Sequence, residues 1–198
     1  MNTNYVESRE SYRYYRKSLS LISKIETQYG CTSIIDVGGW NGFFVARTQM
    51  RDATCLDNSA HPPADDAHHV KMIQSDFLEF IPEKSYDICC CMQVLEHIPE
   101  PEVHAFAKKL FDVGKHVVIS VPFKWPEGGC EHHCQDPVDH AKLASWTGRK
   151  PDWSRVVSEE GPVPFKKRIR RLSRILRGRD PHKNRSFDRR LICYYKNS

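Results

Sequence analysis

The chain has 198 residues, 39% of them hydrophobic, with 30 Lys and Arg against 25 Asp and Glu. This length suits one domain, and its longest apolar runs, 88–92 and 117–121, are too short to span a bilayer. The polar, tyrosine-rich residues 1–16 lack the apolar segment of a secretory signal. We therefore expect a single domain without a transmembrane helix, and the adjacent cysteines at 89–91, which lie in an apolar run, indicate a reducing, cytoplasmic setting.

The cysteines and the charge distribution refine this picture. Cys89, Cys90 and Cys91 are adjacent in an apolar run, where they behave as small buried hydrophobes rather than disulfide partners. The net charge of +5 is local: residues 165–190 contain 12 Lys and Arg but only 2 Asp and Glu, which leaves the rest of the chain net acidic.

The first two thirds of the chain alternate between short apolar strands and helical patterns, which predicts a doubly wound, mostly parallel α/β sheet. A helix in 5–29 ends at Gly30, and the link between the second and third strands is short enough to reduce its helix to a turn. The predicted strands are 33–37, 53–57, 70–74, 86–92 and 116–121, and the predicted helices are 41–50 and 101–111, with a short amphipathic run at 77–81.

After residue 122 the pattern is less regular. Residues 122–139 are rich in Pro, Gly, His and Cys and are predicted to form a loop. A short helix at 141–146, a strand at 153–158, a basic amphipathic helix at 165–177 and a final strand at 191–195 are expected to follow.

Polar and glycine residues follow each of the first four parallel strands, at the edge where open α/β sheets bind ligands. They are Asp36 with Gly38, Gly39 and Gly42, then Asp57, Asp76 and the turn 93–97. Glycine lets the backbone approach a ligand closely, and a carboxylate about 20 residues further on suits both hydroxyls of a ribose. The spacing is not that of a dinucleotide turn, because no G-x-G-x-x-G is present.

The ordered set Asp-Val-Gly-Gly-Trp-Asn-Gly, Leu-Asp, Gln-Ser-Asp-Phe and Val-Leu-Glu-His-Ile-Pro resembles the class I S-adenosylmethionine-dependent methyltransferases over residues 30–125. The resemblance implies a seven-stranded sheet with helices on both faces and an antiparallel seventh strand at 190–196. It also implies that Gly38 and its turn approach the methionine part of the cofactor, Asp57 the ribose hydroxyls and Asp76 the adenine amino group. The implied cofactor-binding residues are Asp36, Gly38, Gly39, Trp40, Gly42, Asp57, Asn58, Asp76, Phe77 and Gln93.

Trp40 stands where that family has its middle glycine. A positive φ is energetically unfavourable for tryptophan. We therefore expect either that Gly39 adopts the positive φ in its place or that the cofactor pocket is reshaped. The second outcome would favour a non-catalytic domain that binds S-adenosylmethionine or S-adenosylhomocysteine.

Residues 120–126, 133–139 and 143–149 resemble, more weakly, small bacterial methyltransferases of surface polysaccharide synthesis. This resemblance implies that 122–149 is a lid over a small-molecule or glycan acceptor whose hydroxyl is methylated. His97 and His133 are candidate bases, because imidazole titrates near neutrality, and Asp136 is a candidate partner for His133. His97 is equally well explained as a residue that orders the turn after the fourth strand.

Cys130, His132, His133, Cys134 and His140 have residue types that suit zinc. Four ligands normally come from two separated pairs, however, and only one cysteine pair is present, so we expect no metal.

The basic segment leaves three interpretations open. The apolar stripe of 165–177 packs on the sheet edge, or residues 165–190 contact an anionic membrane at its inner face, or they bind RNA, which the scarcity of aromatic residues disfavours. We accordingly expect one domain divided into 1–29, 30–121, 122–149 and 150–198, with S-adenosylmethionine-dependent O-methylation as its function. An RNA methyltransferase and a non-catalytic binding domain are the alternatives.

Overall fold

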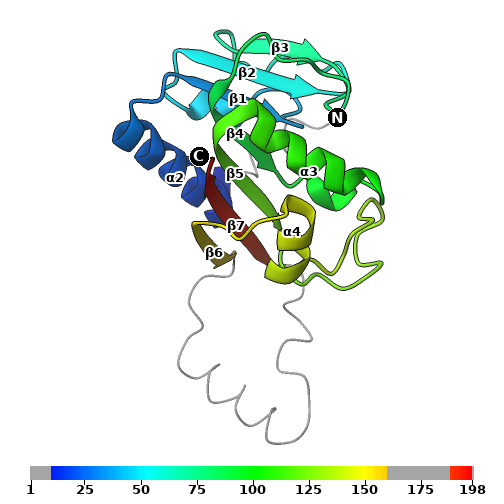
Figure 1. Ribbon diagram of the computed structural model, residues 1–198. Helices are drawn as coiled ribbons and strands as arrows, with labels where there is room; N and C mark the ends of the chain where they lie inside the picture. The colour runs from blue at the N-terminus through cyan, green and yellow to red at the C-terminus, as the bar shows by residue number, and fades with distance from the viewer. Residues whose placement is uncertain (1–9, 160–187, 198) are drawn as a thin grey trace, which may run out of the picture.

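The structure is a computed structural model that describes residues 10–159 and 188–197 (Figure 1). Each strand occurs within two residues of its predicted range. The elements are α2 (Arg13–Tyr29), β1 (Ser33–Val37), η1 (Val45–Arg47), β2 (Asp52–Asp57), β3 (Lys71–Gln74), β4 (Tyr86–Met92), η2 (Leu95–His97), α3 (Glu102–Val113), β5 (Gly114–Pro122), α4 (His140–Thr147), β6 (Trp153–Ser158) and β7 (Arg189–Lys196).

The seven strands form one sheet in the order β3-β2-β1-β4-β5-β7-β6. β1 to β5 pair in parallel, whereas β7 runs antiparallel to both β5 and β6. The strand order reverses between β1 and β4, and a crevice forms at such a point beyond the carboxyl ends of the strands. The predicted doubly wound sheet with an antiparallel seventh strand is thus confirmed.

Helices cover both faces of the sheet (Figure 1). α3 and α4 pack on one face and α2 and η1 on the other, each against its own apolar core. Because successive strand residues point to opposite faces, Ile34 contributes to one core and Ile35 to the other, and both are fully buried. Within residues 10–159 and 188–197, no helix is both long and apolar enough to cross a membrane.

The helix expected over 41–50 is wrong. The chain instead makes a tight turn and the single 3₁₀ turn η1. Phe43, Phe44 and Val45 are all buried, and three consecutive residues cannot share one face of an α-helix. The run 77–81 is likewise a turn, whereas the link 58–70 lacks a helix as predicted. The predicted basic helix 165–177 lies outside the described residues.

Asp87 joins the amino ends of β1, β4 and β5. Its carboxylate accepts hydrogen bonds from the backbone N–H groups of Thr32 (2.9 Å) and Ser33 (3.2 Å) and from Lys115 Nζ (2.8 Å). Partial burial raises the pKa of Asp87, but these hydrogen bonds outweigh it and hold the pKa below its usual range. Hydrogen bonds of one side chain therefore link β1, β4 and β5 at the end of the sheet opposite the crevice.

Candidate functional site

The glycine turn after β1 lies directly on the strand that it leaves. A Cβ added at Gly39 would lie 2.7 Å from Asp36 Oδ2 and 2.8 Å from Cys55 Sγ. A Cβ at Gly38 would lie 2.6 Å from Val94 Cγ2, and Gly38 has a φ of 73°. Larger residues at either position would push the turn off the sheet, so the glycines keep the backbone open toward the crevice.

Trp40 adopts the left-handed conformation that we expected it to avoid. Its φ is 55°, and Gly42 follows at 77°, whereas Gly39 has no positive φ. Asp57 Oδ2 accepts the Trp40 N–H at 2.9 Å, and the indole packs edge-on against His61 at 5.6 Å between ring centroids. Side-chain contacts thus hold a conformation that costs a non-glycine residue about 1–2 kcal/mol, and the expectation that Gly39 takes it over is wrong.

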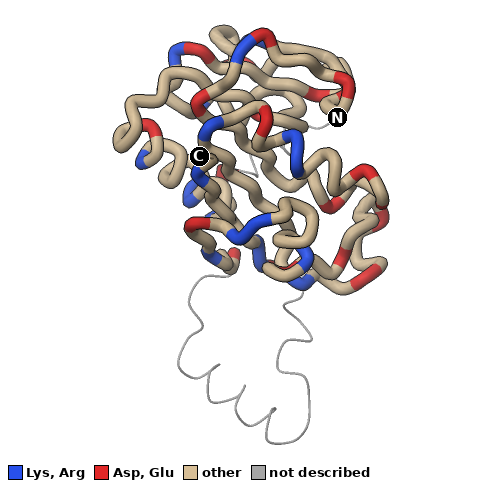
Figure 2. The backbone as a smooth tube through the Cα atoms, in the orientation of Figure 1, with Lys and Arg blue, Asp and Glu red and all other residues tan. Residues whose placement is uncertain are grey.

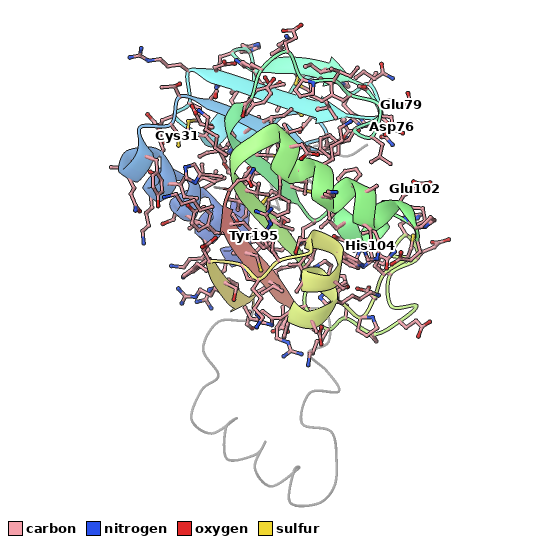
Figure 3. All side chains as sticks on the ribbon, viewed as in Figure 1. Cys31, Asp76, Glu79, Glu102, His104 and Tyr195 are labelled. Carbon is pink, nitrogen blue, oxygen red and sulfur yellow. The ribbon has the colours of Figure 1, made fainter. Side chains whose placement is uncertain are left out.

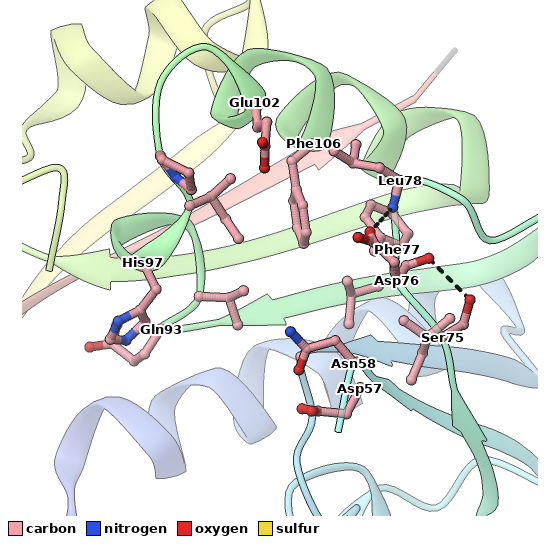
Figure 4. A pocket seen from close by; sticks show the side chains of 16 residues that line it. Asp57, Asn58, Ser75, Asp76, Phe77, Leu78, Gln93, His97, Glu102 and Phe106 are labelled. Atoms are coloured by element: carbon pink, nitrogen blue, oxygen red, sulfur yellow. Dashed lines mark hydrogen bonds between the residues drawn. The ribbon is translucent and has the colours of Figure 1, made fainter. Parts of the chain in front are cut away.

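A cavity of about 430 Å³ opens at the carboxyl ends of β1 to β4 (Figure 4). One side is polar, with Asp57 at the end of β2, Asn58 directly after it and Asp76 after β3, and Gln93 and His97 lie at another end (Figure 4). The apolar wall consists of Val37, Leu56, Phe77, Leu78, Val94, Ile98 and Phe106. Figure 3 shows Asp76 and Glu79 at the same end of the molecule as Glu102 of α3.

Individual contacts define what the cavity residues can offer a ligand. Asp57 Oδ1 accepts the Ser59 N–H at 3.0 Å and lies 3.6 Å from His61 Nε2. Asp76 Oδ1 accepts the Leu78 N–H at 2.8 Å, and its side chain is exposed. The buried ring of Phe77 packs on Phe106 at 4.7 Å. These contacts present carboxylates beside an aromatic wall.

Gln93 is a second strained residue, with a φ of 59° directly after β4. Its N–H donates to the Ser120 carbonyl at 2.8 Å, and its Nε2 donates to Ser120 Oγ at 3.2 Å. Such backbone strain is typical of functional sites, and here it directs the turn 93–97 across the crevice.

A smaller pocket of about 30 Å³ lies on the other side of the glycine turn. Its lining includes Tyr14 and Tyr15 of α2, Asp36 at the base and Gly38, which also lines the larger cavity. Tyr15 Oη donates to the Phe43 carbonyl at 3.2 Å, so α2 is held over the turn. Gly38 is therefore a wall that the two spaces share.

The loop 122–139 rests on the turn after β4 and brings the candidate bases together. Cys134 N–H donates to the Glu96 carbonyl at 2.9 Å, and Gln135 Nε2 donates to the Ile98 carbonyl at 2.8 Å. The rings of His97 and His133 consequently lie 4.8 Å apart, edge to face. His133 Nδ1 lies 2.7 Å from Asp136 Oδ2, and both side chains are almost fully buried.

An aromatic and cationic stack borders these histidines. The Trp125 ring stacks on His133 at 5.3 Å, and the Arg190 guanidinium lies 4.3 Å from the centroid of a Trp125 ring. Burial lowers the pKa of Arg190. The stack joins β7 and the loop 122–139 beside the cavity mouth.

The Cys and His set considered for zinc is not assembled. His140 packs against Phe123 at 5.5 Å and lies 3.4 Å from Ser154 Oγ, and the metal-binding atoms that lie together among the described residues are those of Glu96, His97 and His133. All eight cysteines lie among the described residues and are free thiols, of which only Cys130 and Cys134 are not buried.

Sequence reasoning missed part of the site. Phe106 and Glu102 of α3 line the cavity, but their positions in the chain indicate only a helix that packs on the sheet. The same applies to Tyr14 and Tyr15, whose spacing predicts a packed helix and not the wall of a pocket. Glu96 is buried (1% exposed) beside His97. No sequence signal indicated that His133 of the loop 122–139 would lie next to it.

No protein-family model and no curated protein sequence matches the chain. Solved structures do. The 1,6-didemethyltoxoflavin-N1-methyltransferase of Burkholderia thailandensis, bound to S-adenosylhomocysteine, superposes with a TM-score of 0.61 at 14% identity, covering 94% of this chain and 79% of that one. The N-methyltransferase NodS of Bradyrhizobium japonicum WM9, also with S-adenosylhomocysteine, gives 0.59 at 12% identity, covering 92% and 86%.

A third similar structure is CalS10 of Micromonospora echinaspora, an amino pentose methyltransferase bound to S-adenosylmethionine. It superposes with a TM-score of 0.52 at 14% identity over 64% of this chain and 59% of that one. At these identities the likeness concerns the course of the backbone. The chain therefore has the class I fold of S-adenosylmethionine-dependent methyltransferases.

Proposed function

We propose that the protein transfers a methyl group from S-adenosylmethionine to a hydroxyl of a small-molecule or glycan acceptor. The observation that carries this proposal is the cavity at the carboxyl ends of β1 to β4, with Asp57, Asn58 and Asp76 beside an aromatic wall and the His133–Asp136 pair near its mouth. It matches what an adenosine requires: acceptors for hydroxyl and amino groups next to an apolar surface.

The cofactor's parts are assigned to the two spaces that share Gly38 in their lining. Asp57 would accept the ribose hydroxyls, Asp76 would face the adenine amino group, and Phe77 would lie beside the ring. The methionine part would extend past Gly38 toward the pocket of Asp36 and Tyr15. When bound, S-adenosylmethionine supplies an electrophilic methyl on a positively charged sulfur.

The acceptor is assigned to the mouth formed by His97 and His133. The Asp136 carboxylate accepts a hydrogen bond from the Nδ1–H group of His133, and this contact would orient the ring for Nε2 to act as the base. In the transfer, the acceptor oxygen would take the methyl as the sulfur–methyl bond breaks and leaves S-adenosylhomocysteine, while the hydroxyl proton would pass to Nε2 of His133 and then to water. Most of the rate gain comes from holding the two reactants in line, with the base contributing about 10²–10⁴-fold.

A hydroxyl on a sugar is the acceptor class that we favour. CalS10 is described as an amino pentose methyltransferase, and the weak resemblance of residues 120–149 to methyltransferases of polysaccharide synthesis agrees with a sugar. Acidic residues near the start of α3 and along the loop after β5 (Figure 2) disfavour a polyanionic acceptor at this mouth.

Calorimetric titration with S-adenosylmethionine and S-adenosylhomocysteine tests the cofactor assignment. We expect both to bind the wild-type chain, and Asp57→Asn to weaken binding because the ribose hydroxyls lose a charged acceptor. Asp65→Asn, which changes an exposed carboxylate in the link after β2, serves as the matched control and should bind like the wild type. Absence of binding by the wild-type chain would refute the proposal.

The acceptor assignment needs a separate measurement. Labelled methyl should pass from S-adenosylmethionine to sugar or glycan fractions, and His133→Gln should lower turnover while leaving cofactor binding intact. Transfer to RNA instead would replace the glycan with the alternative acceptor. Cofactor binding without transfer to any fraction would favour the non-catalytic alternative.

A further inference from the structure

Three side chains with metal-binding atoms meet where the loop 122–139 rests on η2. Glu96, His97 and His133 each offer one donor atom, and the three atoms lie within 4.8 Å of one another. Glu96 and His97 are adjacent in the chain, whereas His133 comes from the loop. The group adjoins the larger cavity, because His97 lines it.

Both histidines make a polar contact through Nδ1. His97 Nδ1 lies 2.8 Å from the His132 carbonyl oxygen, and His133 Nδ1 lies 2.7 Å from Asp136 Oδ2. A carbonyl oxygen and a carboxylate oxygen both accept hydrogen bonds, so each ring is oriented through an Nδ1–H group. Metal-binding histidines are oriented in this way, by a carbonyl or a carboxylate on the far nitrogen.

The two segments that carry the donors are fastened to each other independently of any ligand. Cys134 N–H donates to the Glu96 carbonyl at 2.9 Å, and Cys134 Sγ lies 3.4 Å from the His97 carbonyl. An ion would lie about 2.0–2.2 Å from each donor, so its binding draws the three side chains together.

The donor set selects the kind of ion. Two neutral imidazoles and one carboxylate suit zinc, manganese or iron and leave coordination positions open. Magnesium and calcium prefer oxygen ligands. The negative charge of Glu96, buried at 1% exposure, favours a divalent cation, and Arg190, which interacts with the Glu96 charge from β7, opposes it in part.

We propose that Glu96, His97 and His133 bind one divalent transition-metal ion beside the mouth of the cavity. The binding of the ion does not depend on the proposed function. Only the role that we give the ion in methyl transfer rests on it. With Nε2 of His133 bound to the metal, His133 would be a ligand, so its role as the base under the proposed function would apply only to the metal-free protein. The ion instead polarises the acceptor hydroxyl, whose proton leaves to water while its oxygen takes the methyl.

Metal binding can be measured without any methyl transfer. The full chain is stripped with a chelator and titrated by calorimetry with Zn²⁺, Mn²⁺ and Mg²⁺ in turn. We expect one equivalent of Zn²⁺ or Mn²⁺ to bind, with Mg²⁺ much weaker. Addition of Co²⁺ should give d–d absorption without a thiolate charge-transfer band, since the ligands are nitrogen and oxygen and not the nearby Cys134.

Variants assign the site. Glu96→Gln and His133→Gln should each weaken binding by at least about 100-fold, and Asp136→Asn by about 10–100-fold, because it orients a ligand without touching the ion. His140→Gln, an exposed histidine of α4, is the control and should bind like the wild type. Circular dichroism melting confirms that each variant is folded.

Two outcomes would overturn the proposal: no stoichiometric binding by the wild-type chain, or unchanged affinity in the Glu96 and His133 variants. S-adenosylhomocysteine titrated into the same chelated samples separates this failure from failure of the proposed function. Cofactor binding without metal binding refutes only the metal site, and metal binding without cofactor binding refutes only the methyl transfer.

Discussion

Replacing Gly38 by alanine is expected to damage the site through two separable effects. The backbone has a φ of 73°, and the new Cβ would lie 2.6 Å from Val94 Cγ2 and 3.0 Å from Val94 Cγ1. The left-handed conformation costs about 1–2 kcal/mol in a residue with a Cβ, and the overpacking adds about 1–3 kcal/mol. Gly38→Ala should therefore lower the free energy of unfolding by about 2–5 kcal/mol.

Two further variants separate these effects. Gly148 has a nearly equal φ of 68° but nothing within 4 Å of its added Cβ, so Gly148→Ala should cost only the conformational part. Val94→Ala removes the clashing methyl groups. In that background Gly38→Ala should cost about 1–2 kcal/mol, which predicts a favourable coupling of about 1–3 kcal/mol in the double-mutant cycle.

Urea unfolding followed by circular dichroism measures all four free energies of the cycle, and the Gly148 variant is measured alongside. The reasoning is refuted if Gly38→Ala costs no more than Gly148→Ala, or if Val94→Ala leaves the cost of Gly38→Ala unchanged. Titration with S-adenosylhomocysteine then shows whether the double variant, with its clash removed, also regains the cavity.

Other predictions concern the strand ends and the thiols. Gly114→Ala should prevent recovery of folded protein in a solubility and melting assay. The added Cβ would lie 2.8 Å from a backbone atom of β4, and a backbone atom cannot rotate away as a side chain can. A melting temperature near that of the wild type would contradict this prediction. Asp87→Asn should destabilise by about 1.5–3 kcal/mol near neutral pH. Because the folded-state pKa of Asp87 is lowered, the difference in unfolding free energy between the wild type and Asp87→Asn is present above about pH 4. It disappears as the pH falls through the folded-state pKa. Urea unfolding over a pH series measures this difference, and a value that stays constant with pH would contradict the reasoning. A thiol reagent should label Cys130 and Cys134 in the native protein and all eight cysteines after unfolding, since burial raises the pKa of thiols such as Cys90; fast labelling of a third thiol would count against the buried set.

Much of the architecture could be predicted because it depends on local patterns of apolar and polar residues. Runs such as 86–92 are apolar throughout since a strand covered on both faces buries every residue, and β4 spans Tyr86–Met92. The positions of Asp57 and Asp76 at strand ends followed from the same reasoning, because the carboxyl ends of parallel strands meet at one edge of the sheet. Both residues line the cavity.

The turn after β1 shows where local reasoning failed. Phe43, Phe44 and Val45 resemble the start of a helix, but all three are buried under α2 and beside the sheet, so tertiary packing overrides the helical pattern. Trp40 is held at a φ of 55° by a hydrogen bond to Asp57. A partner 17 residues away cannot be inferred from the tryptophan itself.

The sequence by itself determined the succession of strands along the chain, the glycine turn and the carboxylates at the strand ends, since periodicity and residue type are local properties that burial selects directly. Only the tertiary structure decided that His133 lies beside Glu96 and His97, because that distance depends on hydrogen bonds between a loop and a turn more than 30 residues apart. The residue pattern of a loop does not predict which distant residues the loop will contact. The chemistry at the mouth of the cavity is therefore a consequence of how the loop 122–139 docks.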